Sequence, residues 1–480
     1  MKEPIRLEPL FPDRSSGEQL GPQLVRRLRD AIQAGFFPAA SRLLPSRELA
    51  QRLGLSRNTI TVALEQLVAE GYLETRVGAG TFVAPTLHEV HGRVTSGSRS
   101  VPNHAARLVP VKAALDAVGS SFGPLRVGAP ALAAFPSRTW QRIARKTLAS
   151  TGASLDYGDS SGLLALREAI ARHIAQFRGV VADPSRIIIV EGAQGALHLA
   201  AFVLARRGDR VVIEDPCYQL ARATFAAHDL ALEGVAVDDD GLRTSELPDG
   251  ATLAYLSPSH QFPLGGTLTL SRRAELLDWA RRVDAYVIED DYDSEFDAHP
   301  IPALQSMDRD QRVIYVGTFS KTLAPGLRLG YVVAPEHLAE SFRFVREIFS
   351  LGSSAQLQAT LAEFIAGGYF SRHIRRMMKI YECRRALLIG VLSRNLPREF
   401  RLGPAQKGLH VAIIGPSDFD DVRFVNSMAG GERVLPISQL CVRRTDCAGL
   451  LVGFSAGSDD ALMRSAKALA ASLRAYRVIR

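Results

Sequence analysis

Apolar positions near the start of the chain recur at the spacing of an α-helix. Residues 20–34, LGPQLVRRLRDAIQA, place Leu24, Leu28 and Ile32 on one face, and Gly35 follows as a stop signal. We therefore predict an amphipathic helix over this stretch.

Residues 44–83 carry two shorter helical patterns and then a strand-like alternation. Pro45 and Ser46 begin the first helical pattern, Gly54 interrupts it, and Ser56 can cap the second. The runs YLETRV and TFV then alternate apolar and polar residues around the turn GAG, as a β-hairpin does. Two helices with a glycine-containing turn, followed by a hairpin, predict a winged helix-turn-helix over residues 1–85.

Residues 86–110, TLHEVHGRVTSGSRSVPNHAARLVP, are polar and show no sustained periodicity. They predict a flexible linker, and a coil of this length has an r.m.s. reach of about 25 to 30 Å. We expect the modules on either side to move relative to each other.

Beyond the linker, short β-branched runs alternate with amphipathic helical stretches. RIIIVEG precedes GALHLAAFVLARR, DRVVIEDP precedes YQLARATFAAHD, and AYVIEDDYD follows RAELLDWARRVD. Over residues 111–480 this alternation predicts an α/β domain with a mostly parallel sheet and helices on both faces. Ligands of such sheets bind beyond the carboxyl ends of the strands.

Composition sets limits on the class of protein. Apolar residues make up 46% and charged residues 22% of the 480, which is typical of a folded cytoplasmic protein. No stretch reaches the roughly 18 apolar residues of a membrane span, so we expect a cytoplasmic location and no membrane partner. The four cysteines lack metal-ligand or disulfide spacing, so we expect reduced thiols and no metal site.

Charge alone does not support DNA binding, because residues 1–85 hold eleven Lys/Arg against nine Asp/Glu. The motif supports it better. The second helix is expected to present donors and acceptors for phosphates and base edges, with further contacts from the first helix and the turn of the wing. The expected DNA-contacting residues are Arg47, Arg57, Asn58, Thr59, Thr61 and Gly80.

Two amphipathic helices and a hairpin can also be a plain scaffold. The stretch LPSRELAQRLGLSRNT, however, resembles the winged-helix domain of GntR-type bacterial regulators. The resemblance implies a double-stranded DNA operator as partner.

Several polar residues of the larger module come directly after predicted strands. Asp290 and Tyr292 follow the apolar run 285–288 and are two positions apart, so an extended chain points both the same way. Lys321 follows RVIYVGTF, and Tyr218 follows VVIEDPC and offers an aromatic face.

A phosphate seat is predicted at the same sheet edge. EGAQG ends a strand and opens a helix, whose free N–H groups and positive dipole end attract anions. The residues expected to form the seat are Ala193, Gln194, Thr318, Ser320 and Arg328.

Together these groups supply an amine for a Schiff base, a carboxylate for a pyridine nitrogen, a phenol, an aromatic face and a phosphate seat. Pyridoxal 5′-phosphate requires this set. Each group alone has a plainer interpretation: a surface lysine, an ordinary helix start, or a magnesium site at the acidic cluster 289–293. Their convergence favours the cofactor.

The motifs SPSHQFPLG, EDDYDSEF and GTFSKTLAPGLRLGY resemble those of fold-type I aminotransferases, and the resemblance covers residues 110–480. It implies that Lys321 forms the Schiff base, Asp290 meets the pyridine nitrogen, and Tyr292 meets the cofactor's O3′. It also implies that Tyr218 stacks on the ring and that the seat residues bind the phosphate. Since this fold normally forms dimers with shared sites, Tyr157 is expected to reach a neighbouring subunit's phosphate.

A winged helix joined to such a domain resembles the MocR/GabR-type transcriptional regulators. The resemblance implies a homodimer that binds both an operator and pyridoxal phosphate.

Two positions depart from the aminotransferase pattern. Those enzymes hold the substrate α-carboxylate with an arginine in the context R-[IL]-N-F-S, where this chain has Leu451 in LVGFS. Phe262 replaces an asparagine near the cofactor's O3′. Arg443 and Arg444 lie nearby in sequence and could substitute for the missing cation.

Three functions therefore stay open. In the favoured one, the chain senses pyridoxal phosphate itself through an aldimine with Lys321 and controls vitamin B6 genes without catalysis. In the second, the cofactor stays bound and a small amine, such as an amino acid, γ-aminobutyrate or taurine, is sensed through an external aldimine. The third is a working aminotransferase with a DNA-binding module, which Leu451 disfavours.

Overall fold

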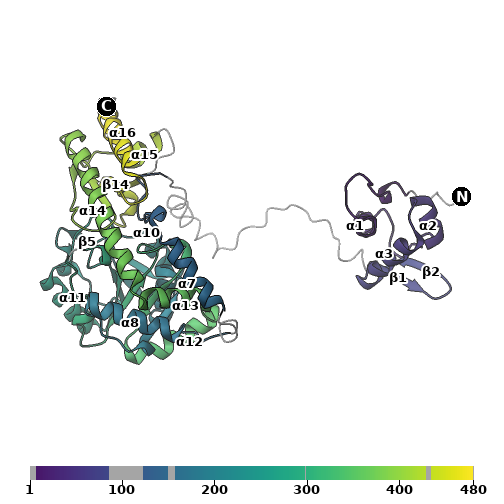
Figure 1. Cartoon of the computed structure of the whole chain (residues 1–480), viewed down its shortest axis with the longest axis horizontal. Coiled ribbons are helices and arrows are strands. Elements are labelled where there is room, and N and C mark those ends of the chain that lie inside the picture. Colours follow the sequence, from purple (N-terminus) through teal and green to yellow (C-terminus); the bar gives the residue numbers. More distant parts are fainter. Residues whose placement is uncertain (1–6, 86–122, 150–156, 298, 429–433, 479–480) are drawn as a thin grey trace. The chain divides into compact units, whose positions relative to one another are not determined.

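The computed structural model describes residues 7–85, 123–149, 157–297, 299–428 and 434–478. The chain divides into two units, Met1–Pro102 and Asn103–Arg480, which Figure 1 draws in purple and in blue to yellow. The predicted linker at 86–110 lies outside the described residues, so its boundaries stay a prediction.

The smaller unit is a three-helix bundle with a two-stranded wing. After a 3-10 turn, η1 (Glu8–Leu10), come α1 (Leu20–Gln33), α2 (Ser46–Leu53), α3 (Arg57–Ala69) and the antiparallel strands β1 (Leu73–Arg76) and β2 (Gly80–Val83). Gly54 ends α2 with a φ of 63°, and Ser56 caps α3 by accepting a hydrogen bond from the Thr59 N–H at 3.0 Å. The predicted winged helix-turn-helix is confirmed.

An eight-stranded sheet forms the centre of the larger unit, with the order β3-β10-β9-β8-β7-β4-β5-β6. Pairing is parallel from β9 through β8, β7 and β4 to β5, while β10 is antiparallel to both β3 and β9, and β6 to β5. The strands are β3 (Ile187–Val190), β4 (Arg210–Asp215), β5 (Ala231–Asp238), β6 (Gly241–Leu242), β7 (Leu253–Leu256), β8 (Tyr286–Asp291), β9 (Val313–Thr318) and β10 (Gly330–Val333). The mostly parallel sheet is as predicted.

Helices cover both faces of this sheet, because its strands are apolar on both sides. In β3, Ile188 and Val190 pack with α9 (Gly192–Leu204), α10 (Gln219–Ala227) and α12 (Ala339–Ser350). Ile187 and Ile189 pack on the other face with α8 (Leu164–Arg178), α13 (Ala355–Ala366) and α14 (Tyr369–Asn395). The other α-helices among the described residues of this unit are α7 (Ser137–Ala149), α11 (Leu270–Val283), α15 (Asp421–Ser427) and α16 (Asp459–Val478).

A second, antiparallel sheet follows with the order β11-β12-β14-β13. Its strands are β11 (Arg401–Leu402), β12 (His410–Ile414), β13 (Leu435–Pro436) and β14 (Gly449–Gly453), and α14 packs beside α16 next to it (Figure 1). Within the described ranges, no helix has the length and apolarity needed to span a membrane.

Asp215, the last residue of β4, ties the central sheet to the C-terminal part. Its carboxylate is buried and accepts hydrogen bonds from the backbone N–H groups of Val442, Arg443 and Arg444 at 2.8, 2.8 and 3.0 Å. This one buried carboxylate therefore accepts hydrogen bonds from three backbone N–H groups of the loop.

Asp215→Ala is expected to lower the free energy of unfolding by about 3 kcal/mol, because three backbone N–H groups lose a charged acceptor. Urea unfolding of the full-length protein, followed by circular dichroism, measures this change. Asp249→Ala is the control, because that carboxylate is 81% exposed and pairs with an exposed Arg282. Asp249→Ala should lower the free energy of unfolding by less than about 1 kcal/mol. Equal stability of the two variants would rule out the tie.

Candidate functional site

A cavity of about 230 Å³ lies at the carboxyl ends of the central parallel strands. It is lined by nine of the residues expected to bind the cofactor: Ala193, Gln194, Tyr218, Asp290, Tyr292, Thr318, Ser320, Lys321 and Arg328. The tenth, Tyr157, is 82% exposed and does not line this cavity. Its expected contact would be with another subunit, so that role stays a prediction.

Lys321 lies three residues after β9 and reaches across to a distant loop. Its Nζ donates a hydrogen bond to the carbonyl oxygen of Gly128 at 2.8 Å. Burial lowers the pKa of the Lys321 amine, an effect opposed by the carboxylates of Asp293 and Asp290. A lowered pKa increases the fraction of neutral amine, which is the nucleophilic form. A side chain at Gly128 would approach Nζ to 2.8 Å, so the loop can pass here only as glycine.

Asp290 lies near the end of β8 and is one of the residues that line the cavity. Its Oδ2 accepts a hydrogen bond from the Tyr255 hydroxyl at 2.7 Å, whereas Oδ1 is buried without a partner among the described residues. Burial raises the pKa of Asp290 to about 6, although the hydrogen bond from Tyr255 opposes this. A buried acceptor of this kind requires a donor. The protonated ring nitrogen of pyridoxal phosphate would supply it.

Tyr292 lines the same cavity as Asp290, as the two-residue spacing predicts. Its hydroxyl donates to the His260 carbonyl oxygen at 3.0 Å and lies 2.9 Å from His260 Nδ1. That ring nitrogen in turn lies 3.0 Å from Asp293. The phenol is thus anchored within the protein, and its contact with the cofactor's O3′ stays a prediction.

Tyr218 precedes α10 and meets Phe262 edge to face, with ring centroids 5.7 Å apart. Burial raises the pKa of the Tyr218 phenol, so the ring stays uncharged at neutral pH. The two rings form an apolar wall against which a pyridine ring could pack.

The residues of the predicted anion seat lie around the start of α9. A Cβ placed on Gly192 would lie 3.6 Å from both Ser320 Oγ and Arg328 Nη1, so a hydroxyl and a guanidinium converge on the N-terminus of this helix. Thr318 Oγ1 donates to Ser320 Oγ at 3.1 Å. These groups and the helix dipole suit a phosphate.

Gln194 supplies a further unused donor at this seat. Its Oε1 accepts from Thr224 at 2.9 Å, and its buried Nε2 forms no hydrogen bond of standard geometry with a described residue, although Gln194 lies close enough to the Tyr218 phenol to lower that group's pKa against the effect of burial. The orphaned Asp290 oxygen at one end and the orphaned amide N–H at the other match the two polar ends of pyridoxal phosphate. The residues present therefore fit that group.

Glu191 connects the seat to a neighbouring helix. Its carbonyl oxygen accepts from Arg328 at 2.7 Å, and its carboxylate accepts from Arg346 of α12 at 2.7 Å and from Ser353 at 3.0 Å. The Arg346 Nε also donates to the Ile189 carbonyl oxygen of β3 at 2.9 Å. One residue thus contacts both Arg328 and α12.

Each acid of the 289–293 cluster has a separate partner. Glu289 accepts from two backbone N–H groups at 2.8 Å, Asp291 pairs with the buried Arg178 at 2.6 Å, and Asp293 pairs with His260. Across the described ranges, no three metal-ligating side chains gather at one point. The geometry gives the magnesium interpretation no support.

The positions that depart from the aminotransferase pattern lie on apolar surfaces. Leu451 of β14 is fully buried in a cluster with Phe262. Arg443 lies 3.6 Å from Glu233 and Arg444 forms a bidentate pair with Asp446 at 2.8 Å, and neither lines the cavity. The geometry of the described residues therefore does not support the alternative in which one of these arginines substitutes for the missing cation.

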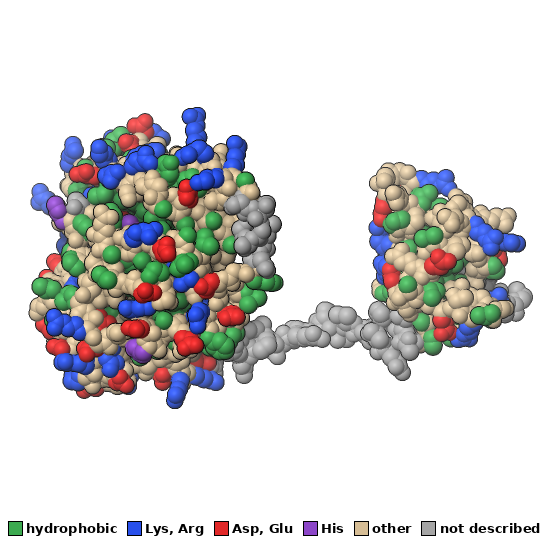
Figure 2. All heavy atoms as spheres, turned by 60° about the horizontal axis from the view of Figure 1, so that its bottom comes forward, with side chains coloured by type: hydrophobic (Ala, Val, Ile, Leu, Met, Phe, Trp, Pro, Cys, Tyr) green, Lys and Arg blue, Asp and Glu red, His purple; other side chains and the backbone are tan. Residues whose placement is uncertain are grey.

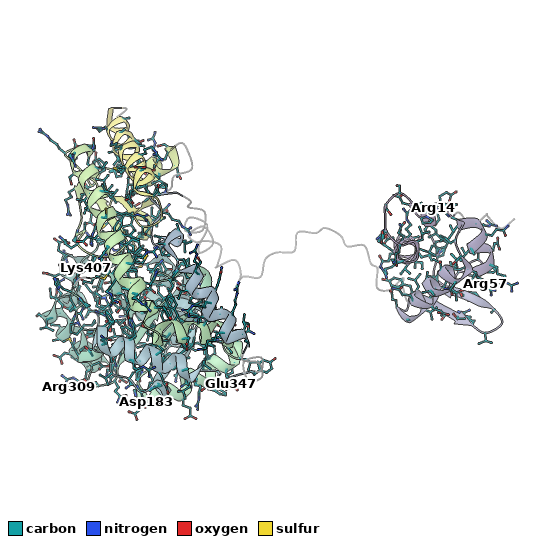
Figure 3. The ribbon with its side chains drawn as sticks, viewed as in Figure 1. Arg14, Arg57, Asp183, Arg309, Glu347 and Lys407 are labelled. Carbon is teal, nitrogen blue, oxygen red and sulfur yellow. The ribbon has the colours of Figure 1, made fainter. Side chains whose placement is uncertain are left out.

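In the smaller unit, the N-terminal end of α3 presents part of the predicted DNA surface. Arg47, Arg57 and Asn58 are exposed, and neither guanidinium forms an ion pair with a described residue; Arg57 is labelled in Figure 3. Figure 2 shows basic and acidic side chains interspersed over the drawn faces of both units. Local geometry, rather than net charge, distinguishes this end of α3.

Thr59 and Thr61 are half-buried, and their contact with DNA stays a prediction. The Thr59 hydroxyl lies 2.7 Å from Ser56 Oγ in the cap of α3, and Thr61 Oγ1 donates to the Arg57 carbonyl oxygen at 2.9 Å. Both hydroxyls already have partners within the helix, because short hydroxyl side chains bond the nearest backbone or cap group.

Gly80 opens β2 with a φ of 114° and passes close to Arg42, since a Cβ there would lie 3.0 Å from Arg42 Nε. Arg42, Thr61 and Gly80 line a cleft of about 410 Å³ between α3 and the wing. Sequence reasoning missed Arg42, which precedes the helical pattern. Likewise it missed Gly128, Tyr255 and His410, which line the larger cavity. Gly128 and His410 come from segments without a strand-end signal.

Two family models match the chain. Residues 20–83 match the bacterial regulatory proteins of the gntR family, and residues 125–436 match aminotransferase class I and II. Among solved structures, Pyrococcus horikoshii kynurenine aminotransferase in complex with PMP is similar, with a TM-score of 0.71 and 26% identity over 76% of this chain and 94% of that one.

Full-length relatives join the same two parts. The chain is 35% identical to the probable rhizopine catabolism regulatory protein MocR of Rhizobium meliloti, over 94% of this chain and 93% of that protein. It is 32% identical to the HTH-type pyridoxine biosynthesis transcriptional regulator PdxR of Corynebacterium glutamicum, over 96% of both. With its GntR winged helix and its class I/II aminotransferase-like domain, the chain belongs to the MocR-type transcriptional regulators of the GntR family.

Proposed function

We propose that this regulator binds operator DNA through its winged helix in the cytoplasm and holds pyridoxal 5′-phosphate covalently through Lys321. Asp290 would face the ring nitrogen, and Gln194, Ser320 and Arg328 at the start of α9 would hold the phosphate. The observation that carries this proposal is the buried, unpartnered Oδ1 of Asp290 in the cavity that Lys321 lines.

We further propose that pyridoxal phosphate is itself the molecule sensed and that vitamin B6 genes are the target. The buried Leu451 supports this, since a leucine offers no charge to a substrate carboxylate. Among the described residues, the cations that line the cavity are Lys321 and Arg328, and both are already proposed to hold the cofactor. Sustained transamination of amino acids is therefore not expected, and the similarity to PdxR agrees with this reading.

A second candidate is a regulator that keeps the cofactor bound and senses a small amine. One observation favours it: the buried His410 is among the residues that line the cavity, and none of the cofactor's groups is assigned to it. A ligand of either kind changes DNA binding only if it binds one arrangement of the protein better than another.

A homodimer is also proposed, from an apolar face on α12. Phe344 and Ile348 are 63% and 62% exposed, and Phe349 packs against the half-exposed Phe202 with centroids 4.9 Å apart. Contiguous exposed apolar groups of this kind mark interaction sites. We expect a second copy of the chain to cover this face. The Tyr157 side chain of that copy would then reach the phosphate in the cofactor cavity.

Lys321→Ala is expected to abolish the visible imine absorption band that forms when the full-length protein is mixed with pyridoxal phosphate, because no amine remains to condense with the aldehyde. Absorption spectra before and after borohydride treatment measure this. Lys146→Ala is the matched control, because that amine is exposed and pairs with Glu363. A normal band from the Lys321 variant would refute covalent attachment.

Arg57→Ala is expected to weaken operator binding at least tenfold, because one guanidinium free to reach phosphate or base edges is lost. Gel-shift titrations at fixed salt measure the change, and the imine band should stay intact. Arg26→Ala removes the same charge from α1, where it is paired with Glu18, and should change affinity little. If the two variants bound the operator with equal affinity, the DNA-contacting surface would not include the start of α3.

Phe344→Asp is expected to shift the protein from dimer to monomer at micromolar concentration, because a charge would be buried in the proposed interface. Analytical ultracentrifugation gives the mass directly. Val181→Asp, at a position 80% exposed and outside the α12 face, should leave the dimer intact. A monomeric wild type, or a dimeric Phe344 variant, would remove α12 as the interface.

A further inference from the structure

One side of α7 carries a row of cations without acids. The helix, SRTWQRIARKTLA, contains no Asp or Glu, and its Arg138, Arg142 and Arg145 are exposed. Because these arginines are spaced close to whole helical turns, they lie along one side of the helix, opposite the buried Ile143. α7 therefore presents three guanidinium groups in a row about 10 Å long.

The first half of α14 repeats this pattern. Residues 369–381, YFSRHIRRMMKIY, contain no acid, and their apolar side chains belong to the core. The exposed cations recur at helical spacing on the opposite side: Arg372, Arg375, Arg376 and Lys379. The next acid along the helix is Glu382, so this side is purely basic over two turns.

The two helices meet at Tyr369, the first residue of α14. Arg142 Nη2 donates a hydrogen bond to the Tyr369 hydroxyl at 2.9 Å, and its guanidinium carbon lies 5.4 Å from the ring centroid. The guanidinium carbon of Arg372 lies 4.6 Å from the same centroid. Tyr369 also stacks on the buried Phe364, with centroids 5.9 Å apart. One anchored ring thus joins the cations of α7 and α14 into a single surface, which we call the basic face.

The charges of the basic face are not neutralised within the chain. Among the described residues, no acid pairs with any of its seven cations, whereas Lys146 of α7 pairs with Glu363 at 3.1 Å. Exposed arginines elsewhere in the unit do have acidic partners, as Arg281 has Asp278 and Arg282 has Asp249. Clustered like charges repel one another, so a bound polyanion would stabilise this surface.

Guanidinium groups in rows suit the phosphates of a nucleic acid. Arginine binds phosphate oxygens through a planar, bidentate fork, and such contacts carry most of the affinity of proteins for duplex DNA. The chain also carries a gntR-type unit over residues 20–83, which delivers it to DNA. A linker with the predicted reach of about 25 to 30 Å would keep the larger unit within about eight base pairs of the bound site, at high effective concentration.

We infer that the basic face is a second DNA-contacting surface, which binds the phosphate backbone of the duplex beside the operator without reading its bases. This inference rests on the proposed function to the extent that the winged helix must first bind the operator. It assigns part of the DNA affinity to the unit that holds the cofactor cavity.

The test compares two duplexes that carry the same operator, mapped by footprinting with the full-length protein. One is trimmed to about 20 base pairs and the other keeps flanks to about 60 base pairs. Fluorescence anisotropy gives the affinity of the full-length protein at several salt concentrations. We expect the wild type to bind the longer duplex at least tenfold more tightly and with a steeper salt dependence.

The triple variant Arg142→Gln, Arg372→Gln, Arg376→Gln should lose this advantage of the longer duplex. Each phosphate contact contributes about 0.9 to the slope of log affinity against log salt, so the slope on the longer duplex should fall by about 3. Affinity for the trimmed duplex should stay the same. Thermal melts and the imine band check that the variant is folded and binds the cofactor.

A matched control removes the same charge from another surface. Arg243→Gln, Arg281→Gln, Arg282→Gln affects exposed arginines that pair with acids, and it should change affinity for either duplex less than twofold. An equal loss in this control would show that net charge, rather than the basic face, is responsible, and would overturn the inference.

The remaining outcomes separate this inference from the proposed function. A wild type that binds neither duplex would overturn operator binding, and the inference with it. Operator binding with the same affinity and salt slope on both duplexes would overturn the inference alone. Vesicles containing phosphatidylglycerol test the alternative polyanion: if the triple variant lost only vesicle binding, the basic face would belong to a membrane surface and not to DNA.

Discussion

A carboxylate kept away from water at the end of a parallel strand is the constraint on which the larger unit's site depends. Burying a charge is costly unless hydrogen bonds offset the loss of hydration. Asp290 has one such bond, from Tyr255, and its raised pKa shows that the offset is incomplete. The surrounding sheet maintains this unfavourable state, because the packed strands on either side leave the carboxylate no other position.

Much of this architecture could be predicted from the sequence, because its signals are local. Ser56 and Gly54 mark helix ends through backbone geometry that does not depend on distant residues. Because parallel strands bring their carboxyl ends to a common edge of the sheet, the predicted strand ends indicated that Asp290, Thr318 and the start of α9 lie close together.

The rest depends on contacts between distant segments. Gly128 and Lys321 are 193 positions apart, and no period or spacing connects them. His410 belongs to the second sheet, whose position over the cavity is set by tertiary packing and by the Asp215 tie. The hydrogen bonds of Thr59 and Thr61 could not be predicted for a different reason, because a helical wheel predicts the face of a side chain but not whether its hydroxyl already has a partner.

Glu191 has a consequence beyond holding one arginine. Its backbone carbonyl supports the cation of the anion seat, while its side chain anchors the helix that displays the exposed apolar face. Ligand binding and dimerisation would then both depend on the position of Glu191. By linkage, if ligand binding changed the free energy of dimerisation, dimerisation would change the free energy of ligand binding by the same amount. The two events would then be coupled rather than independent.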